Sequence, residues 1–188
     1  DVVFSDHVDI GSDIVITDVG SCSAQGVFVV VGSISIRLKM QMTLSARMQA
    51  VNISISSTHM SMLGDAELVT DGLGVSITGQ GIDSSAGGSH GGQGGGVGRR
   101  DPYGSAQAPM LPGSQGGSGA GGGGIVRLQL QGTLSMGSGS TISSNGVAGT
   151  SSSEGGGSGG SVWISVAESI EGDGNIRANG GAGGAGGG

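Results

Sequence analysis

Two stretches of this chain have nearly the same order of residues. "GGIVRLQLQGTLSMGSGSTISSNG" covers 123–146, and "GGSVWISVAESIEGDGNIRANGG" covers 159–181. The apolar residues of the two copies match, with Leu128 corresponding to Ile164 at an offset of 36 and Ile142 to Ile176 at an offset of 34. A partial third copy lies upstream, with Ile77 in an equivalent apolar pair and Ile82 before a glycine run. Self-similarity at a fixed period indicates stacked structural units, as in a solenoid.

Apolar and polar residues alternate within these units and also earlier in the chain. The stretch "ISIRLKMQMTL" is the clearest case. Side chains of a β-strand point alternately to its two faces, whereas a helix repeats every 3.6 residues. The alternation therefore predicts an all-β chain in which one side of this stretch faces the core. We expect the following side chains on that side: Ile34, Ile36, Leu38, Met40, Met42 and Leu44.

The copies have the length of one coil of a parallel β-helix. Without the flanking glycine-rich stretches, each late copy is about twenty residues long (126–145 and 162–179), and stacked coils of this kind bury a shared core. Asn145 and Asn179 precede glycine at the same corner, where we expect their side chains to bond along the stack. We predict that Leu128, Ile164 and Ile77 share one buried ladder. The alternative fold is an antiparallel β-sandwich, which would need tight hairpin turns that are scarce here.

Glycine accounts for 45 of the 188 residues and is concentrated between the apolar blocks. We expect residues 1–188 to form a single β-solenoid domain, a fragment of a longer chain. Glycine-rich loops should leave one corner of it at 86–124 and 146–160. Without side chains, their backbones can pack on one another as extended polyproline-II-like strands; disorder is the alternative. We expect His90 and Tyr103 to organise the long loop, half buried and bonded to backbone groups.

Charge and cysteine content exclude several classes of protein. The net charge is −7, Lys39 is the only lysine, and Arg99–Arg100 is the only basic pair, which argues against nucleic acid and anionic membranes as partners. No apolar run is long enough to span a membrane, so we expect no membrane insertion. The single cysteine, Cys22, permits no internal disulfide and is expected to be buried.

The glycine-rich half of the chain has a distinctive order of motifs. "GGSHGGQGGG" is followed by "DPYG", "GSQGGSGAGGGG", an apolar strand and "RANGGAG". This order, over 79–188, resembles the glycine-rich repeat region of large secreted or cell-surface proteins of plants, protists and bacteria. The resemblance implies an extracellular or cell-surface location and a structural or adhesive role. It brings no enzymatic activity.

Several residues could carry catalysis or bind metal, and for each a structural role is preferred. Ser89, His90 and Asp101 contain the groups of a hydrolase triad, but Ser89 and His90 are adjacent in sequence. His59, Met60 and Met62 could bind a soft metal, although strand-core methionines are the better explanation. Glu168, Glu171 and Asp173 could act on a glycosidic bond, although a solvated corner is favoured.

Two stretches of the chain have features in common with calcium sites. Five aspartates lie within the first eighteen residues (Asp1, Asp6, Asp9, Asp13 and Asp18), either as a solvated face or as calcium ligands. "GGSGGSVWI" resembles a calcium-binding nonapeptide, but Ser161 occupies the aspartate position. We therefore expect no metal, no cofactor and no catalytic residue, and hence no enzyme.

The remaining features concern assembly and modification. Asn52 begins an N-glycosylation sequon and should point outward. The uncharged run Val27, Phe28, Val29, Val30 and Val31 has the signature of a strand that must be covered, so we expect an assembly contact there. The sequence thus predicts a non-catalytic structural subunit of an extracellular filament, surface appendage or surface layer, a homopolymer assembling head to tail. The alternative is a carbohydrate-binding or carbohydrate-active β-helix domain of a cell-surface protein, with surface glycans as its partner.

Overall fold

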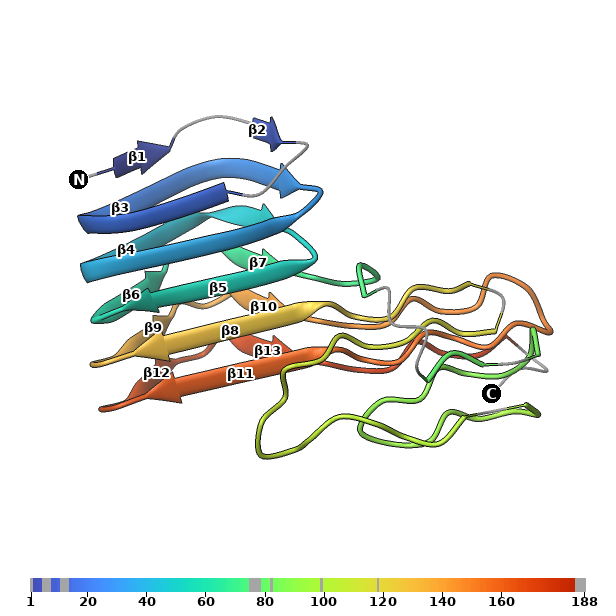
Figure 1. Cartoon of the computed structure of the whole chain (residues 1–188). Coiled ribbons are helices and arrows are strands. Elements are labelled where there is room, and N and C mark those ends of the chain that lie inside the picture. The colour runs from blue at the N-terminus through green and yellow to red at the C-terminus, as the bar shows by residue number, and fades with distance from the viewer. Residues whose placement is uncertain are drawn as a thin grey trace. The chain divides into compact units, whose positions relative to one another are not determined.

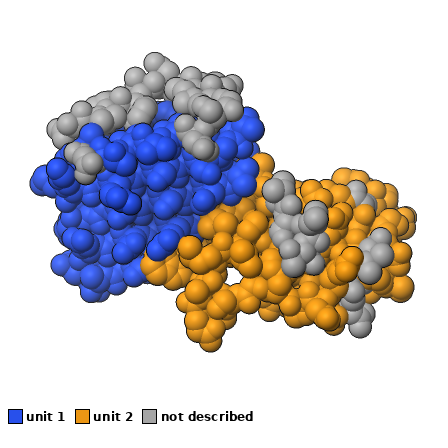
Figure 2. Space-filling model, viewed as in Figure 1, with its two compact units in different colours: residues 1–69, 126–143, 164–176 blue, residues 70–125, 144–163, 177–188 orange. Residues whose placement is uncertain are grey.

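The structure is a computed structural model that describes residues 2–4, 8–10, 14–74, 79–81, 83–98, 100–117 and 119–184. These described residues divide into two compact units (Figure 2). The first unit contains Asp1–Val69, Val126–Ser143 and Ile164–Ile176, and the second contains Thr70–Ile125, Ser144–Trp163 and Arg177–Gly188. Several residues named above lie outside the described part of the chain: Asp1, Asp6, Asp13, Ile77, Ile82 and Arg99.

The described residues form thirteen strands and no helix, which confirms the predicted all-β class. In chain order the strands are β1 (Val2–Phe4), β2 (Val8–Ile10), β3 (Ile14–Val30), β4 (Ser33–Gln49), β5 (Asn52–Ser57), β6 (His59–Met62), β7 (Glu67–Val69), β8 (Ile125–Leu130), β9 (Leu134–Met136), β10 (Thr141–Ser143), β11 (Ser161–Val166), β12 (Ile170–Gly172) and β13 (Asn175–Arg177).

The strands belong to one sheet of parallel strands that curls until it is nearly closed (Figure 1). The strand order β11-β8-β5-β4-β6-β9-β12 runs through it. Off this path, β7 pairs with β4 and β10, and β10 pairs in turn with β13. Long strands β3 and β4 bend and so contribute to more than one side of the sheet. Parallel registers of this kind are incompatible with the antiparallel sandwich that the sequence left open.

Like residues stack on like residues along the buried face of this sheet. One ladder, followed from strand to strand by residue pairing, contains five residues: Cys22, Met42, Met60, Leu134 and Ile170. The first four are buried, as expected where parallel strands superimpose their inward side chains. On the side formed by β8 and β11, the Ala167 N–H donates to the Leu130 carbonyl. This register puts Leu128 beside Ile164, as predicted, but only Leu128 is buried, and Ile77 lies outside the described residues.

The alternation predicted for β4 fails at one position. Met40 is 62% exposed instead of buried, and Lys39 and Gln41 on either side of it also face outward. The pairing shows why: β4 pairs with β5 before this point and with β6 after it, so the strand turns a corner here. Three successive outward side chains accommodate the bend, and Met42 returns to the core.

The second unit consists mostly of glycine-rich segments joined by backbone hydrogen bonds. The N–H groups of Gly155, Ser158 and Ser161 donate to three different segments, at the carbonyls of Ser84, Ser114 and Gly124. Gly157 and Gly160 donate elsewhere, to Val147 and Ser144. Donors on one side of this segment are thus three residues apart. Three residues is the repeat of a polyproline II helix, a conformation without internal hydrogen bonds.

Close backbone approach explains why these segments are glycine. A Cβ placed on Gly123 would overlap the Ser144 carbonyl oxygen, and one on Gly157 would overlap the carbonyl of Gly121. The space that a side chain would need is occupied by neighbouring backbone. The unit is therefore packed by backbone on backbone, and this packing involves both of the glycine-rich stretches identified in the sequence.

Candidate functional site

His90 and Tyr103 lie together in the second unit and bond to backbone carbonyls. His90 Nδ1 is 2.9 Å from the Gly159 oxygen, and the Tyr103 hydroxyl donates to the Pro112 oxygen at 2.6 Å. The ring centroids are 4.9 Å apart with a tilt of 49°. Both side chains are more than half buried. Half-buried rings that bond to backbone groups were expected here from the sequence. A glycine-rich segment has few other side chains that could hold it in place.

Ser89 has a structural environment and is not arranged as a nucleophile. Its hydroxyl donates to the Arg100 carbonyl at 2.6 Å and accepts the Gly94 N–H at 2.9 Å, and the side chain is fully buried. Gly87–Gly91 matches the G-x-S-x-G string of a nucleophile elbow. A nucleophile elbow needs a preceding strand and a following helix, and neither flanks Ser89 in 83–98. The hydroxyl and His90 thus bond to different carbonyls, and no triad forms.

A ladder of Asx side chains follows one corner of the second unit. The backbone N–H of Asn145 donates to Asp71 Oδ1 at 2.6 Å, and its side-chain Nδ2 donates to Oδ2 at 3.1 Å. The N–H of Asn179 donates in turn to Asn145 Oδ1 at 2.9 Å. The side chains of Asn145 and Asn179 were expected to bond along the stack; Asn145 does so, whereas Asn179 bonds through its backbone N–H. Asp71 was missed, although it also precedes a glycine and could have been recognised by that signal.

One end of the parallel sheet has open strand edges. Within the described chain, β11 pairs only with β8, β12 only with β9 and β13 only with β10. Ile170 on β12 is 53% exposed and Ile176 on β13 is 46% exposed, and Ile164 is partly exposed. The residues on the preceding rungs, Leu134 and Leu128, are fully buried. Strands β11, β12 and β13 therefore present open edges together with apolar side chains.

The run Val27–Val31, proposed above as an assembly contact, lies mostly inside the sheet. Val27, Phe28 and Val29 pair with β4, and Phe28, Val29 and Val30 pair with β2. Phe28 and Val30 are buried, while Val31 follows the strand and is exposed. Because strands of the same chain cover both edges, the reason for expecting a partner chain there does not hold.

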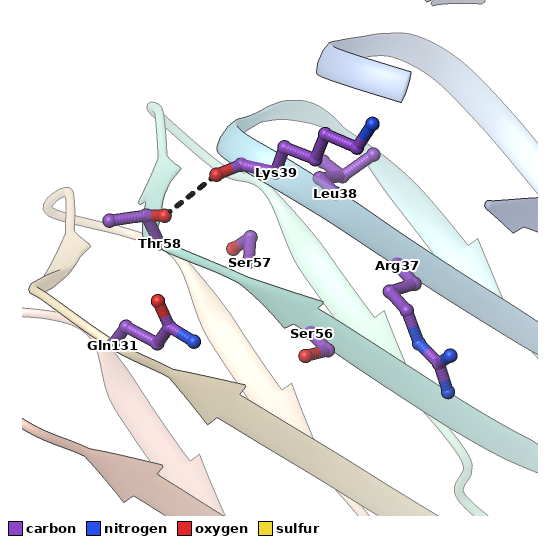
Figure 3. A pocket seen from close by; sticks show the side chains of 7 residues that line it. All are labelled: Arg37, Leu38, Lys39, Ser56, Ser57, Thr58 and Gln131. Atoms are coloured by element: carbon purple, nitrogen blue, oxygen red, sulfur yellow. Dashed lines mark hydrogen bonds between the residues drawn. The ribbon is translucent and has the colours of Figure 1, made fainter. Parts of the chain in front are cut away.

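A polar hollow of about 310 Å³ lies on the outer side of the first unit (Figure 3). Its lining residues are Arg37, Leu38, Lys39, Ser56, Ser57, Thr58 and Gln131. The Thr58 hydroxyl donates to the Lys39 carbonyl at 2.9 Å. Figure 3 shows the charged ends of Arg37 and Lys39 pointing away from one another, so the two cations do not converge on a common anion. The lining contains neither a carboxylate nor an aromatic ring.

The other candidate ligands are distributed over the surface and core. His59 points outward, and its Nδ1 accepts the Thr133 N–H at 3.1 Å, whereas Met60 and Met62 are buried. The three do not form a soft-metal site. Among the described side chains, no group of three or more His, Cys, Asp or Glu residues is placed to hold a metal ion.

The carboxylates in and around β12 are all exposed. Glu168 accepts from the Thr133 hydroxyl at 3.2 Å, Glu171 accepts from Ser169 at 2.7 Å, and Asp173 is exposed nearby in sequence. Ser161, at the aspartate position of the calcium repeat, is buried and donates to the Leu111 carbonyl at 2.6 Å. The three carboxylates are thus solvated surface groups, whereas Ser161 takes part in local packing.

Two titratable groups have altered pKa values. Burial raises the pKa of the Cys22 thiol. Hydrogen bonds from the Thr150 hydroxyl and N–H, and from the Ser151 N–H, lower the pKa of Glu154. Neither group lies among the catalytic candidates. Asn52 is the first residue of β5 and is partly exposed, with its side chain on the outer face.

No helix in the described part of the chain has the length and apolar character that crossing a membrane requires. No family model, no curated protein and no solved structure matches the chain.

Proposed function

We propose that the chain is a non-catalytic structural subunit of an extracellular filament, surface appendage or surface layer, in which copies assemble head to tail. We further propose that its nearly closed sheet is a parallel β-solenoid. Ile14 pairs with Ile34 and Ile34 with Ile53, so successive rungs are roughly twenty residues apart, the length of one solenoid coil. The order of glycine-rich motifs, which resembles that of large secreted and surface proteins, supports the proposed location.

The open edges of β11, β12 and β13 carry this proposal. An uncovered strand edge with exposed apolar side chains is a template for pairing with another chain. Because the apolar side chains of Ile170 and Ile176 are exposed there, solvent contact at that edge costs additional free energy. We therefore place the assembly contact at this last coil and not at Val27–Val31, which the chain itself covers.

The direction of the strands favours a head-to-tail arrangement. All recorded strand pairs in the sheet are parallel, so a coil that continued the ladders would run in the same direction. Two copies joined in this way use different surfaces, and the next copy can be added by the same contact. Such a heterologous contact does not close on itself and produces a filament.

The proposal is tested by placing a charge on the open edge. Ile170→Lys adds a cation to a side chain that is already half exposed, so the monomer should fold normally. Leu63→Lys is the matched control, because Leu63 is 51% exposed but lies after β6, away from the last coil in the strand order. Sedimentation velocity over a concentration series should show assembly by the wild type and Leu63→Lys, but not by Ile170→Lys. A wild-type protein that remains monomeric at all concentrations refutes the proposal.

A second candidate function is glycan binding at the polar hollow. Ser56, Thr58 and Gln131 offer hydroxyl and amide groups suited to sugar hydroxyls. The absence of a carboxylate and an aromatic ring from the lining makes binding, rather than hydrolysis, the form of this alternative. Binding of soluble polysaccharides by the wild type and by Gln131→Ala, measured by isothermal titration calorimetry, distinguishes it from a purely structural role.

A further inference from the structure

The outer side of the parallel sheet carries an excess of positive charge over parts of β4, β5 and β8 and the residues that directly follow β5 and β8. We call the outward side chains of three stretches the polar face: 33–39, 52–58 and 126–131. These stretches contain Arg37, Lys39 and Arg127, three of the seven Lys and Arg residues of the chain, and neither Asp nor Glu. In the whole chain, acidic residues outnumber basic ones by fourteen to seven. The polar face therefore differs in sign from the chain as a whole, and charge complementarity selects an anionic partner for it.

Strand pairing arranges the polar face in rows. Strands β4, β5 and β8 are neighbours in the sheet (Figure 1), and Arg37 on β4 pairs with Ser56 on β5. On the other side of β5, the Gln131 N–H donates to the Ser57 carbonyl, so β8 continues the same rows. Neighbouring strands are about 4.8 Å apart, and side chains on one face of a strand follow one another at about 6.6 Å. Hydroxyl and amide side chains lie in these rows with the cations: Ser35, Ser54, Ser56, Thr58, Gln129 and Gln131.

The hollow of the first unit lies within the polar face. Arg37, Lys39, Ser56 and Gln131 line it, and these four side chains make no hydrogen bond or ion pair to the described residues. Arg37 and Lys39 are exposed, and their charged ends point away from one another (Figure 3). A single small anion would therefore contact at most one of the two cations, whereas a polymer with repeated negative charges can contact both.

We propose that the polar face binds an acidic polysaccharide, a sugar polymer that carries carboxylates at intervals along its chain. The inference rests on the second candidate function, glycan binding at the hollow, and adds the charge class of the glycan. Carboxylates pair with the guanidinium of Arg37 and the ammonium of Lys39, and sugar hydroxyls exchange hydrogen bonds with the Ser, Thr and Gln side chains. Each exposed ionic contact contributes little by itself. Several contacts to one polymer add up, because every contact after the first is intramolecular.

A sugar polymer fits this face better than a nucleic acid does. Duplex DNA carries one charge for about every 1.7 Å of its length, and proteins that bind it neutralise many phosphates at once. Single strands are bound by stacking their bases on aromatic side chains. The stretches 33–39, 52–58 and 126–131 contain three cations and no aromatic residue. Spaced cations with hydroxyl and amide groups between them match a polymer whose charges are spaced and whose other groups are hydroxyls.

The proposal is tested by removing charge from the polar face. The double variant Arg37→Gln/Lys39→Gln should bind polygalacturonate about threefold to tenfold more weakly than the wild type, the effect of two exposed ionic contacts. The matched control is Arg100→Gln/Arg177→Gln, which removes the same charge from two exposed side chains of the second unit and should bind like the wild type. Because all four side chains are exposed, thermal unfolding of both variants should match the wild type.

The readout is isothermal titration calorimetry at pH 7 and low ionic strength, where salt screens exposed charges least. The probes are polygalacturonate, neutral dextran and a single-stranded oligonucleotide. Preference of the wild type for polygalacturonate, weakened in Arg37→Gln/Lys39→Gln and kept in the control, supports the proposal. If dextran binds as tightly as polygalacturonate, or if the face variant binds polygalacturonate like the wild type, the charge inference is wrong while glycan binding stands. Tighter binding of the oligonucleotide overturns the choice of a sugar polymer. A wild type that binds neither polysaccharide overturns both the inference and the second candidate function.

Discussion

His90 Nδ1 lies 2.9 Å from the carbonyl oxygen of Gly159, 69 residues later in the chain. The contact joins two glycine-rich segments that have few side chains of their own. Tyr103 packs against the same imidazole and donates a hydrogen bond to the Pro112 carbonyl. The two aromatic side chains therefore bond to two separate backbone segments. In a unit packed by glycine backbone, the few large side chains must supply much of the fixed geometry.

Replacing His90 with alanine should loosen the long glycine-rich segment. We expect residues 87–124 to become more sensitive to protease and to exchange amide hydrogens faster, because the side-chain bond to Gly159 is lost. The parallel sheet should keep its protection. Gln93→Ala is the control, since Gln93 is exposed in the same segment. Equal exchange in the His90 variant and the wild type would show that His90 does not organise this segment.

Two glycine-to-alanine substitutions should have opposite effects. At Gly123 a Cβ would overlap the Ser144 carbonyl oxygen, so Gly123→Ala should force the segments apart and lower the melting temperature strongly. At Gly92 no atom lies within 4 Å of the added Cβ. Gly92→Ala should be tolerated or stabilise the fold by about 0.4 to 1 kcal/mol, because alanine restricts the unfolded chain. Equal melting temperatures for the two variants, measured by calorimetry, would contradict backbone packing at Gly123.

Leu128 and Ile164 occupy adjacent rungs but should differ in their contribution to monomer stability. Leu128 is fully buried, so Leu128→Ala should lower the free energy of unfolding by about 2 to 5 kcal/mol. Ile164 is partly exposed on the open coil, so Ile164→Ala should cost less in dilute solution. Urea unfolding at low protein concentration measures both. A larger loss for Ile164→Ala than for Leu128→Ala would mean that the last coil is covered in the monomer.

The sequence predicted the strands well because each carries its own signal. Alternation in β4 and the matching of Leu128 with Ile164 are local patterns that survive in the structure. Met40 was misplaced because a corner interrupts the alternation, and the position of a corner depends on which strand lies alongside. Pairing partners are a property of the whole sheet, and a single strand does not encode them.

The sites were harder to predict, for a related physical reason. Val27–Val31 has the composition of an uncovered strand, but whether a strand is covered is decided by its neighbours, here β2 and β4. The open edges lie instead on β11, β12 and β13, although the sequence of these strands closely resembles that of β8, β9 and β10. By contrast, Asn145 and Asn179 were identified because an Asx residue before glycine at a repeated corner is a local signal.

Cys22 should report on global unfolding of the parallel sheet. The thiol lies on the ladder between β3 and β4, is 2% exposed, and has a pKa raised by burial. Near pH 8 the native protein should therefore react with a thiol reagent far more slowly than the urea-unfolded chain. The raised pKa also predicts a pH effect on stability. Folding favours the neutral thiol, so its contribution is fully present below the unfolded pKa of about 9 and is lost as the pH rises above it.

Urea unfolding of the wild type and of Cys22→Ala at pH 7 and pH 10 separates this effect from other titrations. All other titratable groups are present in both proteins, so their contribution cancels when the pH-dependent losses are compared. The wild type should lose more stability between the two pH values than Cys22→Ala does. Equal losses, or fast labelling of the native thiol at pH 8, would mean that residue 22 is accessible in the folded state and that β3 opens locally without unfolding of the sheet.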